Sequence, residues 1–253
     1  MARRSSVRRD VSNEQSIIGG KKHKVVSHKE WVAARKALLK KEKQFTRLRE
    51  QLAAERRALP WERVEKEYEF DTPKGKETLP DLFAGKSQLV IYQFMFASEW
   101  DEGCPHCSFW ADHYDGMLAH LKERDVSFVV VSRAALAKLE KFKLRMGWRF
   151  KWVSSGPTDY NYDFQASFRP EDIGHGRVLY NYETGNMRMT DREGISVFYK
   201  DQNGSIFHTY STYARGIDAV NPTYQFLDLV PKGRDENPDQ PQDWVRYHNR
   251  YMR

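Results

Sequence analysis

Cysteine is scarce in this sequence: the chain of 253 residues has two, at positions 104 and 107. A secreted protein that relies on disulfides needs more cysteines, spread along the chain, so this class is excluded. No apolar run approaches the roughly 18 residues that span a bilayer, so we expect no membrane partner. No apolar segment follows the N-terminal arginines, as it would in a secretory signal. We therefore expect a cytoplasmic protein.

The net charge of +7 is concentrated near the N-terminus. Residues 1–29 contain eight lysines and arginines against two acidic residues, so they carry +6 and the rest of the chain carries only +1. Nucleic-acid binding needs a basic surface on the folded part, so we expect no nucleic-acid partner. Residues 1–27 are predicted to be a disordered basic tail, because charged termini with few apolar residues rarely fold. A targeting segment or a contact for an anionic partner is the alternative.

A highly charged segment with a thin apolar stripe follows over residues 28–60. Trp31, Leu38, Phe45 and Leu52 recur at helical spacing, which predicts a long helical extension that Pro60 ends. Such a helix packs along a domain or pairs with a second copy. A homodimer through this helix is therefore one expected assembly.

Two nearly continuous apolar runs mark the centre of the chain, at residues 88–96 and 126–131. Runs of this kind are typical of central strands that are buried on both faces. Residues 104–124 between them have one apolar helical face, so the three segments predict a parallel βαβ unit with a right-handed crossover. A further helix is predicted over residues 134–146, ended by Gly147.

Residues 148–193 have no long period and are rich in aromatics. We expect an aromatic-rich insertion there, with a short strand near Trp152. Its aromatic residues either cover a cleft over the cysteines or form a local core. Two β-rich runs at 195–200 and 205–210 flank Asn203-Gly204, which predicts a terminal β-hairpin. A final helix is expected over residues 218–229, and residues 231–253 are expected to be a tail with a short helix.

These elements predict an α/β domain over residues 61–230 with parallel central strands and a terminal antiparallel hairpin. This is the thioredoxin-like arrangement, in which an active dithiol lies at the start of the helix after the first central strand. Cys104-Pro105-His106-Cys107 lies at that point of the sequence.

The chemistry of disulfide exchange suits these four residues. The thiolate is the nucleophile, and the unpaired N–H groups of a first helical turn stabilise it. We predict Cys104 as the attacking thiol, Cys107 as the resolving thiol and His106 as a group that lowers the Cys104 pKa. Pro105 fits the first turn because it has no N–H to leave unpaired. A lowered Cys104 pKa favours the reduced pair and predicts a relatively oxidising dithiol.

A Cys-x-x-Cys pair can also be half of a structural zinc site, which needs four ligands. The chain has no second cysteine pair, and His113 and His120 lie farther along the same expected helix. We therefore expect no metal and no cofactor. His208 lies in a predicted strand and is expected to be a hydrogen-bonded strand histidine.

Long segments of the chain resemble one family. They include GCPHCSFWADHYDG (103–116), RMGWRFKWVSSG (145–156), SVFYKD (196–201) and FHTYSTYARG (207–216). The chain resembles the thioredoxin-like proteins catalogued as domain-of-unknown-function family 899 and labelled predicted dithiol–disulfide oxidoreductases. The resemblance covers roughly residues 30–250. It implies a thioredoxin fold with Cys104 and Cys107 as the active site.

One stretch departs from the pattern of that family. Thioredoxin-like proteins usually place a cis-proline before the strand that faces the dithiol, and in this family a proline often stands where this chain has Glu193. Residues 191–195 contain no proline. We expect the backbone of Gly194 or Ile195 to present the substrate in its place, with Trp100 and Pro105 also at the substrate site.

Three functions fit these residues. The first is thiol–disulfide exchange with a disulfide- or thiol-containing substrate and a reductant that the sequence does not name. The second is peroxide reduction, since residues 79–94 resemble the opening of peroxiredoxins, although their Pro-x-x-x-Thr-x-x-Cys signature is absent. The third is a non-catalytic module that senses redox state and binds a partner.

Overall fold

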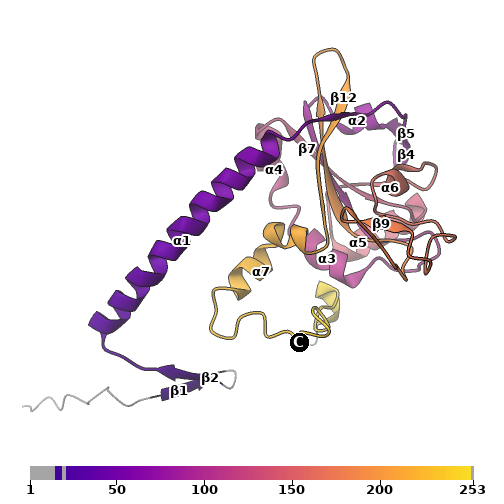
Figure 1. Cartoon of the computed structure of the whole chain (residues 1–253). Coiled ribbons are helices and arrows are strands. Elements are labelled where there is room, and N and C mark those ends of the chain that lie inside the picture. The colour runs from indigo at the N-terminus through magenta and orange to yellow at the C-terminus, as the bar shows by residue number, and fades with distance from the viewer. Residues whose placement is uncertain (1–14, 19–20, 252–253) are drawn as a thin grey trace, which may run out of the picture. The chain divides into compact units, whose positions relative to one another are not determined.

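The computed structural model describes residues 15–18 and 21–251 (Figure 1). The contacts within the chain divide it into two units. The first unit contains the described residues up to Ala58 together with Phe226–Asp235. The second contains Leu59–Gln225 and the described residues from Glu236 onward. No helix in the described part of the chain is long and apolar enough to cross a membrane.

The first unit contains the predicted long helix, α1 (His28–Arg57). Ser27 and Glu30 form a capping box at its start: the Glu30 carboxylate accepts from the Ser27 N–H at 3.0 Å, and the Ser27 hydroxyl accepts from the Glu30 N–H. The antiparallel strands β1 (Gln15–Ile18) and β2 (Lys21–Lys24) precede it, where a disordered tail was expected. The rest of that predicted tail, residues 1–14 and 19–20, lies outside the described residues.

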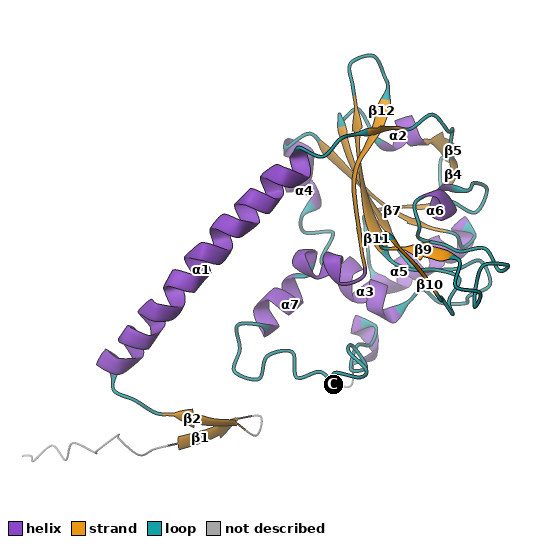
Figure 2. Ribbon diagram, in the orientation of Figure 1, coloured by secondary structure: helices purple, strands orange, loops and turns teal. Residues whose placement is uncertain are grey.

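The second unit is built on one mixed sheet, which has eight strands within the described residues (Figure 2). Across the sheet the strands are β3 (Glu62–Arg63), β12 (Ile206–Tyr213), β11 (Gly194–Lys200), β6 (Gln88–Gln93), β7 (Val126–Ser132), β8 (Lys151–Ser154), β4 (Glu69–Thr72) and β5 (Gly75–Thr78). The strands β6, β7 and β8 are parallel, and the other neighbouring pairs are antiparallel.

Four central strands have the thioredoxin order, β12-β11-β6-β7. The chain passes from β6 through α3 (Pro105–Ala111) to the parallel β7, and the β11–β12 hairpin lies beside β6. The predicted βαβ unit and the terminal hairpin are therefore confirmed. Gly204 in the hairpin turn has a φ of 84°, a left-handed conformation that glycine adopts without strain. The fold is α/β and thioredoxin-like.

The remaining elements are mostly short. They are α2 (Leu79–Leu82), α4 (Leu118–Glu123), α5 (Leu136–Met146), α6 (Tyr160–Asp163), α7 (Pro222–Leu227), the paired strands β9 (Val178–Tyr180) and β10 (Glu183–Gly185), and the 3-10 helices η1 (Ala214–Val220) and η2 (His248–Arg250). The helix predicted over residues 134–146 corresponds to α5. Gly147 ends it with a φ of 70°, as predicted.

The single helix predicted over residues 104–124 is wrong, because the chain forms α3 and α4 with turns between them. The Asp115 carboxylate lies in the break and accepts hydrogen bonds from the N–H groups of Arg149, at 2.9 Å, and Phe150, at 2.8 Å. Asp115 and Gly116 are also weak helix formers. A tertiary contact and low helix propensity together end the first helix early.

The helices predicted near the C-terminus are also shorter than expected. The helix predicted over residues 218–229 begins only at Pro222, because proline lacks an N–H and fits only the first helical turn. The residues before it form the 3-10 helix η1. In place of the short helix expected in the tail, there is the single 3-10 turn η2.

The predicted aromatic insertion is partly integrated into the sheet. The strand expected near Trp152 is β8, which pairs with β7 in the main sheet. Its aromatic residues pack into the core: Trp152 lies 4.7 Å from Phe94, centroid to centroid, and Trp148 lies 5.8 Å from Phe142. The insertion therefore helps to build the domain on which the cysteines sit.

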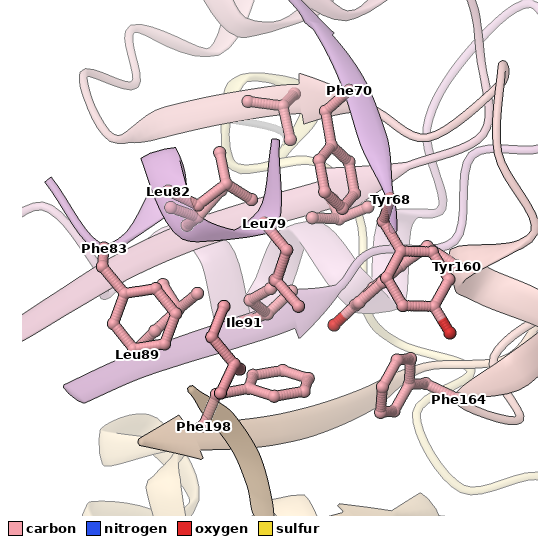
Figure 3. Packing of buried hydrophobic residues seen from close by; sticks show 14 residues of the cluster. Tyr68, Phe70, Leu79, Leu82, Phe83, Leu89, Ile91, Tyr160, Phe164 and Phe198 are labelled. Carbon is pink, nitrogen blue, oxygen red and sulfur yellow. The ribbon is translucent and has the colours of Figure 1, made fainter. Parts of the chain in front are cut away.

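The main apolar cluster joins the sheet to the insertion (Figure 3). The ring of Phe164 lies 4.7 Å from that of Tyr160 and 5.1 Å from that of Phe198. Full burial of a side chain such as Phe198 contributes about 1.5–3 kcal/mol. Ile91 of β6 belongs to this cluster, whereas the next residue, Tyr92, points to the opposite face and packs 5.1 Å from Tyr114. That opposite face carries the cysteines.

Candidate active site

Close packing fixes the loop that carries Cys104. A Cβ on Gly103 would lie 2.6 Å from the Phe94 ring, so only glycine fits there. The Cys104 N–H donates to the Met95 carbonyl at 3.0 Å. The Cys104 carbonyl accepts from the Ser108 N–H at 3.0 Å and from the Ser108 hydroxyl at 2.9 Å. Cys104 is thus held at the N-cap position of α3, as predicted.

The two cysteines are unbonded and differ in exposure. Cys104 is partly exposed, whereas Cys107 is 2% exposed. The Cys107 Sγ accepts a hydrogen bond from the Met95 N–H at 3.4 Å. Cys104 is therefore the more accessible of the two thiols.

The surroundings shift the pKa values of the two thiols in opposite directions. Hydrogen bonding with the Cys107 side chain holds the pKa of Cys104 well below its usual range, and hydrogen bonds from His106 and the Cys107 backbone add to it. Burial raises the pKa of Cys107 well above its usual range, and the hydrogen bond and the charge of Cys104 raise it further. The preferred charge state is therefore a Cys104 thiolate beside a Cys107 thiol.

His106 follows Cys104 on α3 and interacts with two groups. Its hydrogen bond with Cys104 is the largest cause that raises the pKa of His106, and a hydrogen bond with the backbone of Gln242 acts in the same direction. An imidazolium has two donors and can serve both partners at once. The charged form of His106 is thus favoured next to the Cys104 thiolate.

The segment from Gln242 to Arg250 packs against the dithiol loop. The Tyr247 hydroxyl donates to the Gly103 carbonyl at 2.6 Å, and Arg250 donates to the Glu102 carboxylate at 2.7 Å. The Trp244 ring packs edge-on against Phe109 of α3, at 5.4 Å between centroids. Trp244, Tyr247 and Arg250 were not predicted to be part of the site. Aromatic residues in a polar segment do indicate, however, that the segment packs against the domain.

A cavity of about 380 Å³ opens on both sulfurs. Its apolar lining includes Met95, Trp110, Met189 and Ile217, and its ionisable lining, besides the cysteines, consists of Tyr92, His106, Arg192, Glu193, Arg215 and Asp218. These residues come from α3 and its cap, β6 and the loop after it, η1 and the loop before β11. The cavity therefore combines an apolar wall with several charged groups around one reactive thiolate.

Four residues were predicted to contact the substrate: Trp100, Pro105, Gly194 and Ile195. None of them is among the described residues that line this cavity. Pro105 lies between the cysteines on α3, and the Trp100 carbonyl accepts from the Lys138 ammonium at 2.7 Å. Gly194 packs under the Tyr213 ring, where a Cβ would lie 2.5 Å from it. Ile195 pairs with Tyr92 across the sheet. Their contact with substrate stays a prediction.

Two residues of the stretch 191–195, Arg192 and Glu193, line the cavity with the two cysteines. Burial raises the pKa of the Glu193 carboxyl, and the nearby Cys104 raises it further. The Tyr180 hydroxyl donates to the Glu193 carbonyl at 3.0 Å. A carboxyl group thus occupies the place where a proline was expected.

Two other histidines, His208 and His113, make hydrogen bonds outside the cavity. His208 is hydrogen-bonded within the sheet, as predicted: its Nε2 lies 2.7 Å from the Ser211 hydroxyl and its Nδ1 lies 3.3 Å from the Glu62 carboxylate. His113 Nε2 lies 2.9 Å from the Thr223 hydroxyl. Among the described residues, no group of three or more Cys, His, Asp or Glu side chains is arranged to hold a metal ion.

The fold and the Cys-x-x-Cys pair at the start of α3 define a thioredoxin-like protein. The chain belongs to the family described as "Bacterial protein of unknown function (DUF899)", which it matches over residues 20–251. No curated protein matches its sequence.

Several solved structures are similar to this chain in fold. Peroxidoxin BcpB from Mycobacterium tuberculosis is 15% identical, with 64% of this chain and 94% of that chain covered and a TM-score of 0.43. A cysteine-to-serine mutant of peroxiredoxin Q from Xanthomonas campestris is 18% identical, with 62% and 90% covered and a TM-score of 0.40. A cysteine-to-serine mutant of peroxiredoxin 6 from Arenicola marina is 12% identical, with 72% and 80% covered and a TM-score of 0.42.

Proposed function

We propose that this protein is a thiol–disulfide oxidoreductase in which Cys104 and Cys107 act as one redox dithiol. The observation that carries the proposal is the opposite shift of the two thiol pKa values inside one cavity. A nucleophile needs to be a thiolate at neutral pH, and a resolving thiol needs to stay protonated until its partner has reacted. Cys104 and Cys107 meet these two needs respectively.

The reaction takes two steps. In the first, the Cys104 thiolate attacks one sulfur of a substrate disulfide, forms a mixed disulfide with it and releases the other sulfur as a thiolate, which takes a proton. In the second, Cys107 loses its proton and attacks the Cys104 sulfur, and the second substrate thiolate leaves. The substrate disulfide is reduced by two electrons, and the dithiol is oxidised to an internal disulfide. A thiol reductant, whose identity the chain does not specify, restores the dithiol.

The groups that stabilise the Cys104 thiolate, the Cys107 side chain first and His106 after it, favour one direction of exchange. The hydrogen bond of His106 stabilises the Cys104 thiolate, which exists only in the reduced pair. Stabilising the reduced form makes the internal disulfide a stronger oxidant. A substrate dithiol is therefore the favoured reactant, and the oxidised protein transfers its disulfide to it by the reverse of the two steps.

The test compares two single-cysteine variants with a small aromatic disulfide, 5,5′-dithiobis(2-nitrobenzoate). Wild-type protein is expected to release two coloured thiolates per chain, and Cys107→Ser is expected to release one and retain a mixed disulfide that mass spectrometry detects. Cys104→Ser is expected to react at least about 100-fold more slowly, because its remaining thiol is buried and protonated. An unchanged rate in Cys104→Ser would overturn the proposal.

The same variants distinguish the alternatives. If stoichiometric peroxide forms a sulfenic acid at Cys104 faster than the small disulfide reacts, the protein is a peroxide reductase instead. If neither reagent reacts with Cys104 faster than with an unfolded control peptide, the pair is not catalytic.

A further inference from the structure

The long helix α1 exposes large apolar side chains to solvent. Trp31, Leu38, Phe45, Leu48 and Leu52 are each between 47% and 61% exposed, and no residue of α1 is buried. A single exposed apolar residue needs no explanation, but a row of them along one helix marks an interaction surface. The spacing of these residues shows which kind of partner the surface fits.

The apolar residues of α1 recur at an interval of seven residues. Trp31, Leu38, Phe45 and Leu52 occupy one position of this heptad, which we call position a, and Leu48 lies three residues after Phe45, at position d. A repeat of about 3.5 residues per turn keeps a narrow stripe facing one other helix, as in a coiled coil. A helix that packs on its own domain has a wider stripe with a period of about 3.6. The stripe of α1 therefore has the form of a coiled-coil seam.

The partner that fits this seam is a helix of about the same length. α1 has 30 residues and so extends over about 45 Å. Among the described residues, the next longest helix is α5, which has 11 residues and buries Leu139 and Phe142 in the second unit. The matching helix must therefore come from another molecule, and a second copy of this chain supplies one with the same length and the same repeat.

Two charged residues in the seam favour one direction of such a pair. Lys41 and Glu55 both occupy position d. In a parallel pair each d residue faces its own copy, so Lys41 would face Lys41 and Glu55 would face Glu55. In an antiparallel pair with Phe45 opposite Leu48, Lys41 lies about 4.5 Å along the axis from Glu55 of the second copy. The two charges attract in the antiparallel pair and repel in the parallel one.

We infer that α1 binds the α1 of a second copy of this chain as an antiparallel two-stranded coiled coil, with Phe45 of each copy opposite Leu48 of the other. Leu52 then covers the aliphatic stem of Lys41 from the second copy, whose ammonium group reaches the edge of the seam. The inference concerns the assembly of the protein and does not depend on the proposed function.

The charges beside the seam favour this register over its neighbours. Positions e of the two helices lie side by side in an antiparallel pair, so Glu42 comes next to Arg49 of the second copy. A shift by one heptad in one direction would place Glu42 next to Glu42, and a shift in the other direction would place Arg49 next to Arg49. Within its own helix Glu42 accepts from Arg35 at 2.8 Å. Arg35 approaches Arg56 of the second copy, and their repulsion limits the paired region to about residues 38–55.

Sedimentation of the full chain over a range of concentrations tests the interface. We expect wild type to form a dimer that dissociates on dilution. Lys41→Glu and Glu55→Lys each bring like charges together and should weaken the dimer at least about tenfold, whereas the double variant should return to within about threefold of wild type. Lys43→Glu and Glu50→Lys make the same changes of charge at exposed positions on the outer face of α1 and are the matched controls. Circular dichroism shows whether each variant remains folded.

The distance between two spin labels tests the direction of the pair. In full-length protein with both cysteines changed to serine, Ala33→Cys gives one labelled site per chain on the outer face of α1. The antiparallel register separates the two labels by about 40 Å along the axis, whereas a parallel pair keeps them within about 20 Å.

Three results would overturn the inference. They are a monomer at every concentration up to about 100 µM, a dimer that both single charge reversals leave unchanged, and a short distance between the labels. Each of these results would leave the proposed function intact, because thiol exchange is measured separately on the single-cysteine variants.

Discussion

The two walls of the dithiol cavity are built differently. One wall comes from the N-terminal part of α3 and its cap residue, with Cys104, His106 and Cys107 within a single helical turn. The opposite wall is assembled from the loop before β11, from η1 and from Gln242. The α3 wall carries the two cysteine sulfurs, whereas the opposite wall supplies a carboxyl group, a backbone partner for His106 and part of the apolar lining. The residues of the α3 wall can be identified from the sequence, because they are neighbours along the chain. The residues of the opposite wall come together only in the folded protein.

A change to the opposite wall at Gly194 should have the largest effect on stability. Gly194→Ala places a Cβ 2.5 Å from the Tyr213 ring and 3.2 Å from the Gln93 side chain, in a buried sheet position. We expect a loss of about 1–3 kcal/mol in the free energy of unfolding, because the core must shift to accept the methyl group. Urea denaturation of Gly194→Ala and of the open-space control Gly185→Ala checks this. Equal stability of the two would mean that the opposite wall is not rigid.

A change at His106, in the α3 wall, should mainly alter the reduction potential of the Cys104–Cys107 pair. His106→Ala removes a hydrogen bond that lowers the pKa of Cys104. Loss of about 1.4 kcal/mol of thiolate stabilisation lowers the reduction potential by about 30 mV. Equilibration with glutathione buffers measures the potential of both proteins. A potential equal to or higher than that of wild type would contradict the role assigned to His106.

The stability of the reduced protein should depend on pH through Cys104. The folded pKa of Cys104 lies below its unfolded value of about 8.5, so the thiolate stabilises the reduced fold above that value and the stabilisation disappears as the pH falls through the folded pKa. Urea denaturation of reduced wild type and reduced Cys104→Ser from pH 4 to 9 checks this. The advantage of wild type should shrink steadily with falling pH. A constant difference would show that the α3 wall does not stabilise a thiolate.

The smallest effect is expected where the C-terminal segment meets the α3 wall. Tyr247→Phe removes the hydroxyl that bonds the Gly103 carbonyl and keeps the ring against Phe142, 5.6 Å away. A hydrogen bond of this kind contributes about 0.5–1.5 kcal/mol. We expect a corresponding loss of stability and faster alkylation of Cys104 by iodoacetamide. Unchanged alkylation would mean that this segment does not limit access to the thiol.

The central fold could be predicted from the sequence because its signals are local. The apolar runs of β6 and β7, the Asn203-Gly204 turn and the end of α5 at Gly147 each depend on neighbouring residues. The end of α3 could not be predicted, since it depends on hydrogen bonds that Asp115 makes with a segment more than thirty residues away.

The candidate site divides in the same way. The roles proposed for Cys104, His106 and Cys107 follow from their spacing in one helical turn. In the sequence, Glu193 was noted only because a proline often stands at this position in the family. No local pattern shows that Glu193 lines the cavity of the dithiol. The hydrogen bond between Tyr247 and Gly103 joins residues that are 144 positions apart in the sequence, and no periodicity reveals such a pair.

The contact of the C-terminal segment with the dithiol loop has a consequence for synthesis of the protein. The ribosome makes the chain from its N-terminus, so the strands that hold Cys104 and Cys107 can pair as soon as β12 has emerged. Gln242, Trp244 and Tyr247 are joined to the chain only after β12 is complete. Each newly made molecule therefore passes through a stage in which its two thiols lack the contacts of this segment.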